Sequence, residues 1–506
     1  MFRIDDIING VLASTTDPLC IALIFLGTVV GLTFGCLPGL TATMGCALLI
    51  PVSYSLDTIP AFGLLLGCYV GGVAGGAISA CLLNIPGTPS AICTTLDGYP
   101  MAQQGKGARA LGWAAMASGI GGVLSWIVLV ALSTAMAAFC ADFSSSEYAV
   151  VALLGLLLTM TMSKKSFTKG IVTAALGIML GCVGIDIIYG NFRFTFGTTS
   201  LLSGFDTVPV SIGAFALPQI IGLFVHPVDR KQPKVSARGF LPSIRDIWKH
   251  KWNIIRSSII GTVIGIIPAI GQVTASFFAY DLAKRAGSTE KEAFGEGNCD
   301  GVIAPETANN AVCGGAMVPL LTLGIPGDQT TAILLGGLML HGLRAGPQLF
   351  IENYDVVVGL YTTLLIATIF MVIAQTFGIK LFCKMLATPC NFLAPLLLVL
   401  AMVGCFAIRS NPFDCVVCLC VGIVCYFMDR AGYSVTCLVM GLVLGSTFEA
   451  ELRRTLLTTH NDWSVFITRP FSCVMTLLCA AVIIWTIVRQ IRASHGKVGK
   501  YDEFED

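Results

Sequence analysis

Two Ile-Pro-Gly segments within apolar sequence are the residues best suited to hold a small charged molecule. The first lies in residues 83–91 (LNIPGTPSA) and the second in residues 323–332 (LGIPGDQTTA). Because proline lacks an N–H group and glycine permits unusual backbone angles, we expect each segment to interrupt a helix. The helix that restarts directs unpaired N–H groups and a positive dipole end at the gap. Such a gap favours a carboxylate, and the freed carbonyl groups favour a small cation.

A second polar group precedes the second Ile-Pro-Gly segment. Asn298, Asp300, Glu306, Asn309 and Asn310 adjoin a long apolar run. Acidic and amide groups in such a position are costly unless they pair with one another or line a pathway. Amides bind carboxylate oxygens through N–H and cations through C=O, so the two adjacent asparagines favour a binding role.

Two alternatives stay open at this point. The Ser, Thr and Asp residues at the restarts can be helix N-caps alone, and the polar group can be a loop with a helix start at Pro305. Under the binding interpretation, the predicted substrate-binding residues are Asn84, Thr88, Ser90, Asn309, Asn310, Thr330 and Thr331. The predicted cation-coupling residues are Pro38, Gly39, Pro268, Glu306 and Asp328.

The composition determines what must position these residues. Of the 506 residues, 55% are hydrophobic and only 12% are charged, whereas about a quarter are charged in an ordinary globular chain. Charge-free stretches such as 18–56, 58–96 and 110–141 recur along the chain, and about 20 apolar residues cross the hydrocarbon core as a helix. We therefore predict an all-α polytopic membrane protein. The net charge of +1 argues against a nucleic-acid partner.

An internal repeat organises the chain. The pattern G-x-x-x-G-x-x-P occurs at residues 31–38 and again at residues 261–268. Gly-Gly-Ala precedes both Ile-Pro-Gly segments, and the offsets between copies are 230 to 240 residues. We therefore predict two repeat halves. They are residues 1–227 and 257–506, joined by a basic linker at 228–256.

Loop charges predict the orientation of the two copies. The linker carries eight basic residues, which places it in the cytoplasm; they are Arg230, Lys231, Lys234, Arg238, Arg245, Lys249, Lys251 and Arg256. Following the charges outward, the first copy leaves the membrane at 97–109 on the cytoplasmic side and the second at 344–355 on the opposite side. The C-terminus is predicted to be cytoplasmic. Opposite exits define an inverted-topology repeat with broken or re-entrant helices, which is a transporter architecture.

Other chemistry has less support. Most of the 20 cysteines lie in apolar runs, where a thiol packs as a small apolar group. Neither H-E-x-x-H, G-x-S-x-G with triad partners, nor a P-loop is present in the sequence, so we expect no enzymatic activity. An intramembrane hydrolase or lipid-linked transferase and a passive anion channel remain the alternatives to a transporter.

The residues also resemble a known family. PGLTATMGCALLIP, YVGGVAGGAISACLLNIPGTPSA and LDGYPMAQQGKGARAL in the first copy, and FGEGNCDGVIAPETANNAVCGGAMVPLLTLGIPGDQTTAILLGGLMLHGL in the second, resemble the large membrane subunit (TctA-like) of the tripartite tricarboxylate transporters. The resemblance covers most of the chain. Ala269 departs from it, since Gly39 occupies that position in the first copy.

The resemblance implies a specific transport system. It implies a multi-pass protein of the bacterial inner membrane that imports tri- or dicarboxylates, with citrate as the default substrate. It also implies two partners, a periplasmic solute-binding protein and a small membrane subunit (TctB-like). Uptake in this family is coupled to Na⁺ or H⁺ rather than to ATP, and no bound cofactor is expected.

Overall fold

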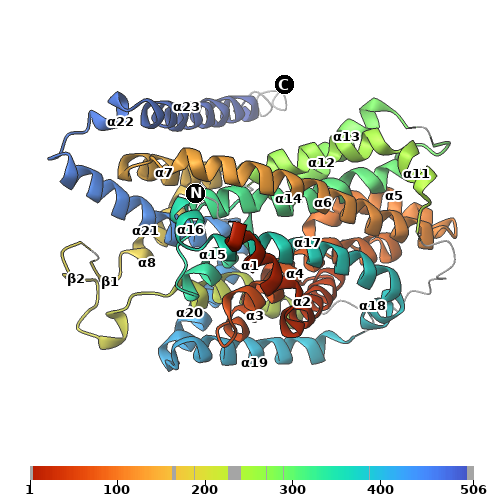
Figure 1. The fold of residues 1–506 in the computed structure, drawn as a ribbon, viewed down its shortest axis with the longest axis horizontal. Helices are drawn as coiled ribbons and strands as arrows, with labels where there is room; N and C mark the ends of the chain where they lie inside the picture. The colour runs from red at the N-terminus through yellow and green to blue at the C-terminus, as the bar shows by residue number, and fades with distance from the viewer. Residues whose placement is uncertain are drawn as a thin grey trace, which may run out of the picture. The chain divides into compact units, whose positions relative to one another are not determined.

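The computed structural model describes residues 4–161, 167–186, 188–225, 241–268, 270–288, 290–386 and 388–498. As predicted, this part of the chain is almost entirely helical, and its β structure is one short antiparallel pair (Figure 1). Within the described residues, nine helices are long and apolar enough to cross a membrane. The prediction of an all-α polytopic membrane protein is confirmed.

The helices form two compact units. Unit 1 comprises Met1–Ala141 and Val208–Tyr426, and unit 2 comprises Asp142–Thr207 and Phe427–Asp506. Each unit therefore takes sequence from both predicted repeat halves, so the spatial grouping differs from the division by sequence. The division into repeat halves stays a prediction, and residues 228–240 of the predicted linker lie outside the described residues.

Unit 1 holds both Ile-Pro-Gly segments. Its first elements are α1 (Ile4–Thr15), α2 (Pro18–Cys36), α3 (Ala42–Ser53), α4 (Thr58–Leu83), the 3₁₀ turn η1 (Pro89–Ala91), α5 (Ile92–Gln103) and α6 (Gly107–Cys140). Next come α9 (Thr207–Ser211), the π-helical turn η3 (Ile212–Ala216), α10 (Leu217–Val225), α11 (Ile244–Lys249), α12 (Lys251–Ile266) and α13 (Gly271–Ala286). The last are α14 (Asp300–Leu323), α15 (Gln329–Leu340), α16 (Pro347–Glu352), α17 (Tyr354–Phe377), α18 (Ile379–Met385), α19 (Cys390–Arg409) and α20 (Pro412–Arg430).

The first repeat copy opens with a helical hairpin, which we call hairpin 1 (α2 and α3). A Cβ atom on Gly31 would lie 2.3 Å from the backbone oxygen of Cys68, so α2 packs closely along α4. One turn later, a Cβ atom on Gly35 would lie 2.1 Å from the oxygen of Gly72, so the two helices run in the same direction. α3 then turns back along α4. Its 12 residues span only about 18 Å, too short to cross a bilayer.

The second copy repeats this arrangement with hairpin 2 (α12 and α13). A Cβ atom on Gly261 would lie 2.2 Å from the oxygen of Ala308 on α14, so Gly261 makes the contact that Gly31 makes in the first copy. The glycines of the two Ile-Pro-Gly segments also correspond. A Cβ atom on Gly87 would lie 2.1 Å from the oxygen of Gly35, and one on Gly327 would lie 2.5 Å from that of Gly265.

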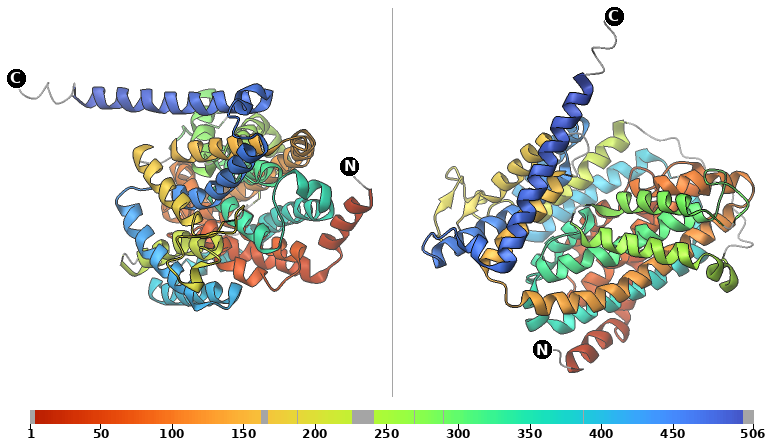
Figure 2. Two further views of the ribbon diagram at one scale, coloured as in Figure 1. Left: turned by 90° about the vertical axis from the view of Figure 1, so that its left-hand side faces the viewer. Right: turned by 90° about the horizontal axis from the view of Figure 1, so that it is seen from above.

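The two copies contact each other at both ends of unit 1, and their inverted topology stays a prediction. The end of α5 meets the start of α14, where Asp97 lies against Gly301. The end of α15 meets the start of α4, where Gly337 lies against Phe62. Figure 2 (right) shows α6, α12 and α14 side by side in this bundle. Which end of unit 1 faces the cytoplasm stays a prediction.

Unit 2 is smaller and contains the β hairpin. Its elements are α7 (Ser145–Thr161), α8 (Phe167–Gly181), β1 (Gly184–Ile185), β2 (Phe192–Arg193), the 3₁₀ turn η2 (Thr199–Leu201), α21 (Val435–Thr458), α22 (Val465–Thr468) and α23 (Pro470–Val498). An ion-pair network fixes the hairpin to α21. Arg193 contacts Asp186 at 3.1 Å and Glu449 at 2.5 Å, and Arg453 contacts Asp186 at 2.6 Å. The hydrogen bond from Arg453 holds the pKa of Asp186 well below its usual range.

We expect Gly31→Ala to destabilise the fold because its Cβ atom would overlap the Cys68 backbone. Overpacking of this kind costs about 1–3 kcal/mol. Gly222→Ala is the matched control, since a Cβ atom at Gly222 meets nothing within 4 Å. Thermal unfolding of the purified protein in detergent measures both. Equal midpoints for Gly31→Ala and Gly222→Ala would contradict the close α2–α4 contact.

Candidate substrate and cation site

Both Ile-Pro-Gly segments interrupt helices, as predicted. A non-helical stretch separates α4 from η1, and another separates α14 from α15. The residue that ends the first helix is left-handed in each copy, with φ of 56° at Asn84 and 68° at Gly324. This conformation is a common helix terminator. Asn84 is exposed, so this predicted substrate-binding residue has an evident role in ending α4.

Asp328 is the centre of one buried polar cluster, which we call the Asp328 cluster. Its carboxylate accepts hydrogen bonds from the Tyr69 hydroxyl of α4 and from the Gln272 amide of α13. It also caps α15 by accepting from the backbone N–H of Thr331 at 2.7 Å. The N-cap interpretation therefore holds for Asp328 and Thr331. It does not account for the additional bonds, through which one carboxylate connects both repeat copies.

The other predicted hydroxyls near the breaks are buried in pairs. Thr330 of α15 lies 2.9 Å from the hydroxyl of Thr43 on α3. Thr88 lies 3.1 Å from the hydroxyl of Ser90, and its side chain makes no capping hydrogen bond to η1. Capping therefore does not explain why the hydroxyl groups of Thr88 and Ser90 are buried here, and their role in substrate binding stays a prediction.

Glu306 is the centre of a second polar cluster, the Glu306 cluster. This fully buried carboxylate accepts hydrogen bonds from Thr94 of α5 at 2.5 Å and from Ser118 of α6 at 3.3 Å. Asn310, one turn along α14, donates to Ser118 at 2.7 Å. All these partners are neutral. Among the described residues, no Lys, Arg or His forms an ion pair with Glu306.

Oxygen atoms without partners accompany the buried carboxylate. The side-chain oxygens of Thr307, Asn309 and Asn310 are buried and have no hydrogen-bond partner. An unsatisfied buried acceptor costs about 1–3 kcal/mol. Together with Glu306, these atoms form a stretch of α14 that is rich in acceptors and lacks a positive charge, which suits a cation.

The two clusters meet where α4 and α14 contact each other. Asn309 donates its amide hydrogen to the backbone oxygen of Val73 at 3.2 Å. Val73 lies one turn along α4 from Tyr69, which binds Asp328. The structure thus brings Glu306, Asn309, Asn310 and Asp328 to the junction between the copies.

The remaining predicted residues lie in the turns of the two hairpins. Pro38 and Gly39 connect α2 to α3, where Gly39 has a φ of +88° that a β-carbon would strain. Pro268 connects α12 to α13, near Gly271, whose added Cβ atom would lie 4.0 Å from Asp328. These turns shape the ends of the hairpins, and a cation-coupling role for Pro38, Gly39 and Pro268 stays a prediction.

The sequence did not single out five residues of the two clusters. They are Thr43, Tyr69, Thr94, Ser118 and Gln272. Tyr69 and Ser118 carry the one available signal, a polar side chain within an otherwise apolar and glycine-rich helix. Thr94 and Gln272 follow the helix breaks, and only the three-dimensional contacts pair them with the carboxylates.

A third carboxylate, Asp97 of α5, closes the end of unit 1 where α5 meets α14. Its Oδ1 atom accepts backbone hydrogen bonds from Gly295 at 2.9 Å, Gly297 at 3.1 Å and Asn298 at 2.8 Å. Its Oδ2 atom accepts from the Tyr280 hydroxyl at 2.9 Å. These bonds hold the α13–α14 loop against α5, so Asp97 is a tether between the copies.

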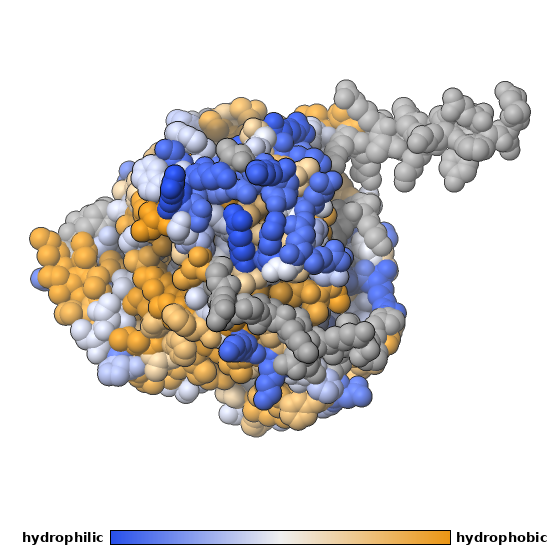
Figure 3. Space-filling view, turned by 90° about the vertical axis from the view of Figure 1, so that its right-hand side faces the viewer, coloured by the Kyte–Doolittle hydropathy of each residue, from blue (hydrophilic) through white to orange (hydrophobic). Residues whose placement is uncertain are grey.

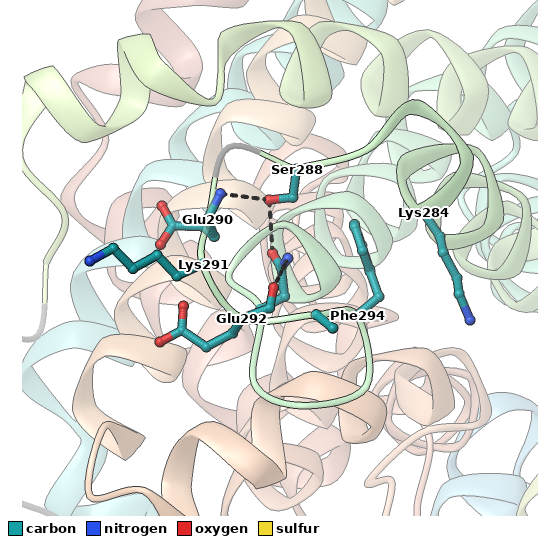
Figure 4. A pocket seen from close by; sticks show the side chains of 8 residues that line it. Lys284, Ser288, Glu290, Lys291, Glu292 and Phe294 are labelled. Atoms are coloured by element: carbon teal, nitrogen blue, oxygen red, sulfur yellow. Dashed lines mark hydrogen bonds between the residues drawn. The ribbon is translucent and has the colours of Figure 1, made fainter.

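The α13–α14 loop also lines a surface pocket of about 380 Å³ (Figure 4). Lys284, Glu290 and Glu292 are among the residues that line it. Lys106 binds Glu292 at 2.7 Å and holds the pKa of that carboxyl below its usual value. The pocket contains none of the residues of the Asp328 and Glu306 clusters.

Helices broken at Pro-Gly segments, with buried polar clusters beside the breaks, are features of polytopic membrane transport proteins. Comparison with known sequences identifies the family. The model of the tripartite tricarboxylate transporter TctA family matches residues 21–440. The chain belongs to this family, and the predicted resemblance is confirmed.

Two relatives from Agrobacterium vitis are similar to the chain. An "uncharacterized 52.8 kDa protein in TAR-I ttuC' 3'region" is 33% identical over 481 residues, which cover 95% of this chain and 96% of the relative. An "uncharacterized protein in TAR-II ttuC' 3'region" is 33% identical over 243 residues, covering 48% of this chain and 100% of the relative. No solved structure matches the chain.

We expect Tyr69 and Asp328 to be energetically coupled because the Tyr69 hydroxyl binds the Asp328 carboxylate. A double-mutant cycle with Tyr69→Phe and Asp328→Asn, measured as free energies of unfolding, should give a coupling of about 0.5–3 kcal/mol. The control is the cycle of Ser133→Ala with Asp328→Asn, because the Ser133 hydroxyl binds Tyr361 and not Asp328. The effects of these two substitutions on the free energy of unfolding should be additive. Additivity for Tyr69 as well would contradict the assigned contact.

Proposed function

We propose that this chain is the transport subunit of a binding-protein-dependent secondary transporter that imports tri- or dicarboxylates by cation symport. Membership in the TctA family supports a tricarboxylate transporter membrane subunit. A periplasmic solute-binding protein and a small membrane subunit are the partners in this proposal. The location is the bacterial inner membrane, with the basic linker and the C-terminus in the cytoplasm.

The observation that carries the symport proposal is the Glu306 cluster. A buried ionised carboxylate without a counter-charge is strongly unfavourable. Thr94 and Ser118 provide hydrogen bonds but no charge, and nearby amide oxygens lack partners. A bound Na⁺ or H⁺ removes this cost. Glu306 is therefore our candidate for the group that carries the coupling cation.

The substrate is proposed to bind beside the helix breaks. Thr88, Ser90 and Thr330 supply hydroxyl donors, and the start of α15 supplies backbone N–H groups. Asp328 repels a carboxylate, so it suits a second cation or a protonated state during binding. Because Tyr69 and Gln272 reach Asp328 from different copies, a movement of one copy against the other changes its hydrogen bonds. This coupling is what alternating access needs.

We expect Glu306→Gln to reduce gradient-driven citrate uptake roughly 10- to 100-fold, since bonds to a charged group are worth about 1.5–3 kcal/mol. The measurement uses proteoliposomes that contain the chain and its small subunit, with the binding protein outside and an imposed Na⁺ or H⁺ gradient. Glu292→Gln is the matched control, because Glu292 lies at the surface and pairs with Lys106. It should transport normally.

Two outcomes contradict this proposal. Unchanged uptake in Glu306→Gln removes Glu306 from the coupling site. Equilibrating uptake that persists after both gradients are dissipated, with no accumulation under either gradient, indicates a passive anion channel.

Repeating the assay with di- and monocarboxylates as competitors determines the substrate class.

A further inference from the structure

The junction of α11 and α12 exposes large apolar side chains, and we call residues 244–252 the tryptophan corner. Ile244, Trp248 and Trp252 are 77%, 65% and 72% exposed. Neither tryptophan packs into unit 1, and α11 contains no buried residue. Exposed tryptophan is unfavourable in water but is enriched where a membrane protein meets the headgroup layer.

An apolar stripe along α12 leads to this corner. Ile255, Ile259 and Val263 are 41%, 59% and 50% exposed, and their spacing places them on one face of α12 with Trp252. The opposite face is buried against α14, for example at Gly261. An exposed apolar stripe of this kind suits contact with the hydrocarbon of a bilayer. The tryptophans lie where the stripe ends.

Basic residues gather at the same level. The ammonium group of Lys251 lies 4.6 Å from the ring centre of Trp248 and 5.6 Å from that of Trp252. Arg245 is exposed on the preceding turn. Lys249 differs, because it binds Glu290 at 2.6 Å, which raises its pKa. Figure 3 shows a hydrophilic patch on the side of the molecule where Figure 1 places α11.

Buried polar contacts of His250 and Asn253 hold the backbone of the tryptophan corner in place. His250, between α11 and α12, contacts Asp300 at 2.8 Å through Nδ1 and Glu290 at 3.3 Å through Nε2. Asn253 donates to Asp300 at 2.7 Å, and the His250 ring packs edge-on against Trp113. These contacts hold the backbone between the two tryptophans against α14 and α6. The exposed rings are therefore presented by a rigid support.

We propose that the tryptophan corner binds the headgroup of an anionic phospholipid. The order along the surface is apolar stripe, then tryptophan, then Lys251 and Arg245. It matches the order of acyl chain, glycerol region and phosphate in a single lipid leaflet. A protein partner with an acidic surface would match the basic residues, but it would leave the continuous stripe on α12 without a hydrocarbon neighbour. Binding would hold hairpin 2 to that leaflet.

The experiment titrates the purified full chain in mild detergent with phosphatidylglycerol or phosphatidylcholine and counts bound lipids by native mass spectrometry. We expect phosphatidylglycerol to bind more tightly. The double variant Arg245→Gln/Lys251→Gln should lose roughly 25-fold in phosphatidylglycerol affinity, since each basic side chain near an anionic surface contributes about fivefold. Lys284→Gln, an exposed lysine of α13 outside the corner, is the matched control and should bind like the parent.

A second measurement tests the tryptophans without relying on charge. Brominated phosphatidylglycerol quenches tryptophan fluorescence at short range. Because Trp463 and Trp485 are also exposed, the double variant Trp248→Phe/Trp252→Phe should lose part of the quenchable signal. Equal affinities for the two lipids, or an unchanged affinity in Arg245→Gln/Lys251→Gln, would overturn the proposal. So would quenching that is unaffected by the loss of both tryptophans. Neither readout requires transport, so failure of the proposed function leaves this test intact.

Discussion

Close backbone contact through glycine is the constraint on which the rest of unit 1 depends. Gly31 and Gly261 allow α2 and α12 to lie directly against α4 and α14, because a Cβ atom at either position would collide with backbone oxygen. In lipid, where apolar surface alone does not drive helix association, such contacts supply the packing energy. They also bring the ends of both hairpins beside the Ile-Pro-Gly breaks, as the contact of Gly87 with Gly35 demonstrates.

The breaks leave backbone groups that need partners in a medium without water. Asp328 satisfies the start of α15, and Asn84 and Gly324 end the preceding helices by turning left-handed. These local solutions cost little. The Glu306 cluster is different in kind, because its carboxylate serves no cap and its neighbours leave oxygens without partners. Hydrogen bonds from Thr94 and Ser118 join Glu306 to two neighbouring helices but supply no charge, and this is the observation on which the proposed ion coupling rests.

Sequence alone predicted the helical membrane fold and both helix breaks, because proline, glycine and charge act through local geometry and solvation. The inverted repeat stays a prediction. It also selected Glu306, Asn309, Asn310 and Asp328, whose polarity contrasts with their surroundings. It could not find the partners Thr94 and Gln272, since a hydroxyl or an amide near a loop is unremarkable until tertiary contacts are known. Nor could it foresee that the compact units would each draw on both halves. Long-range packing decides that grouping.

The two copies differ in where the carboxylates of the Glu306 and Asp328 clusters lie. At the 240-residue offset between the copies, the position of Glu306 is occupied by Leu66 in the first copy, and that of Asp328 by Thr88. Both buried carboxylates therefore belong to the second copy. Their donors Thr94 and Tyr69 belong to the first. In the proposed symport, a cation bound at either of these carboxylates changes the hydrogen bonds that Thr94 and Tyr69 donate from the first copy. Cation occupancy would thereby be linked to the contact between the copies.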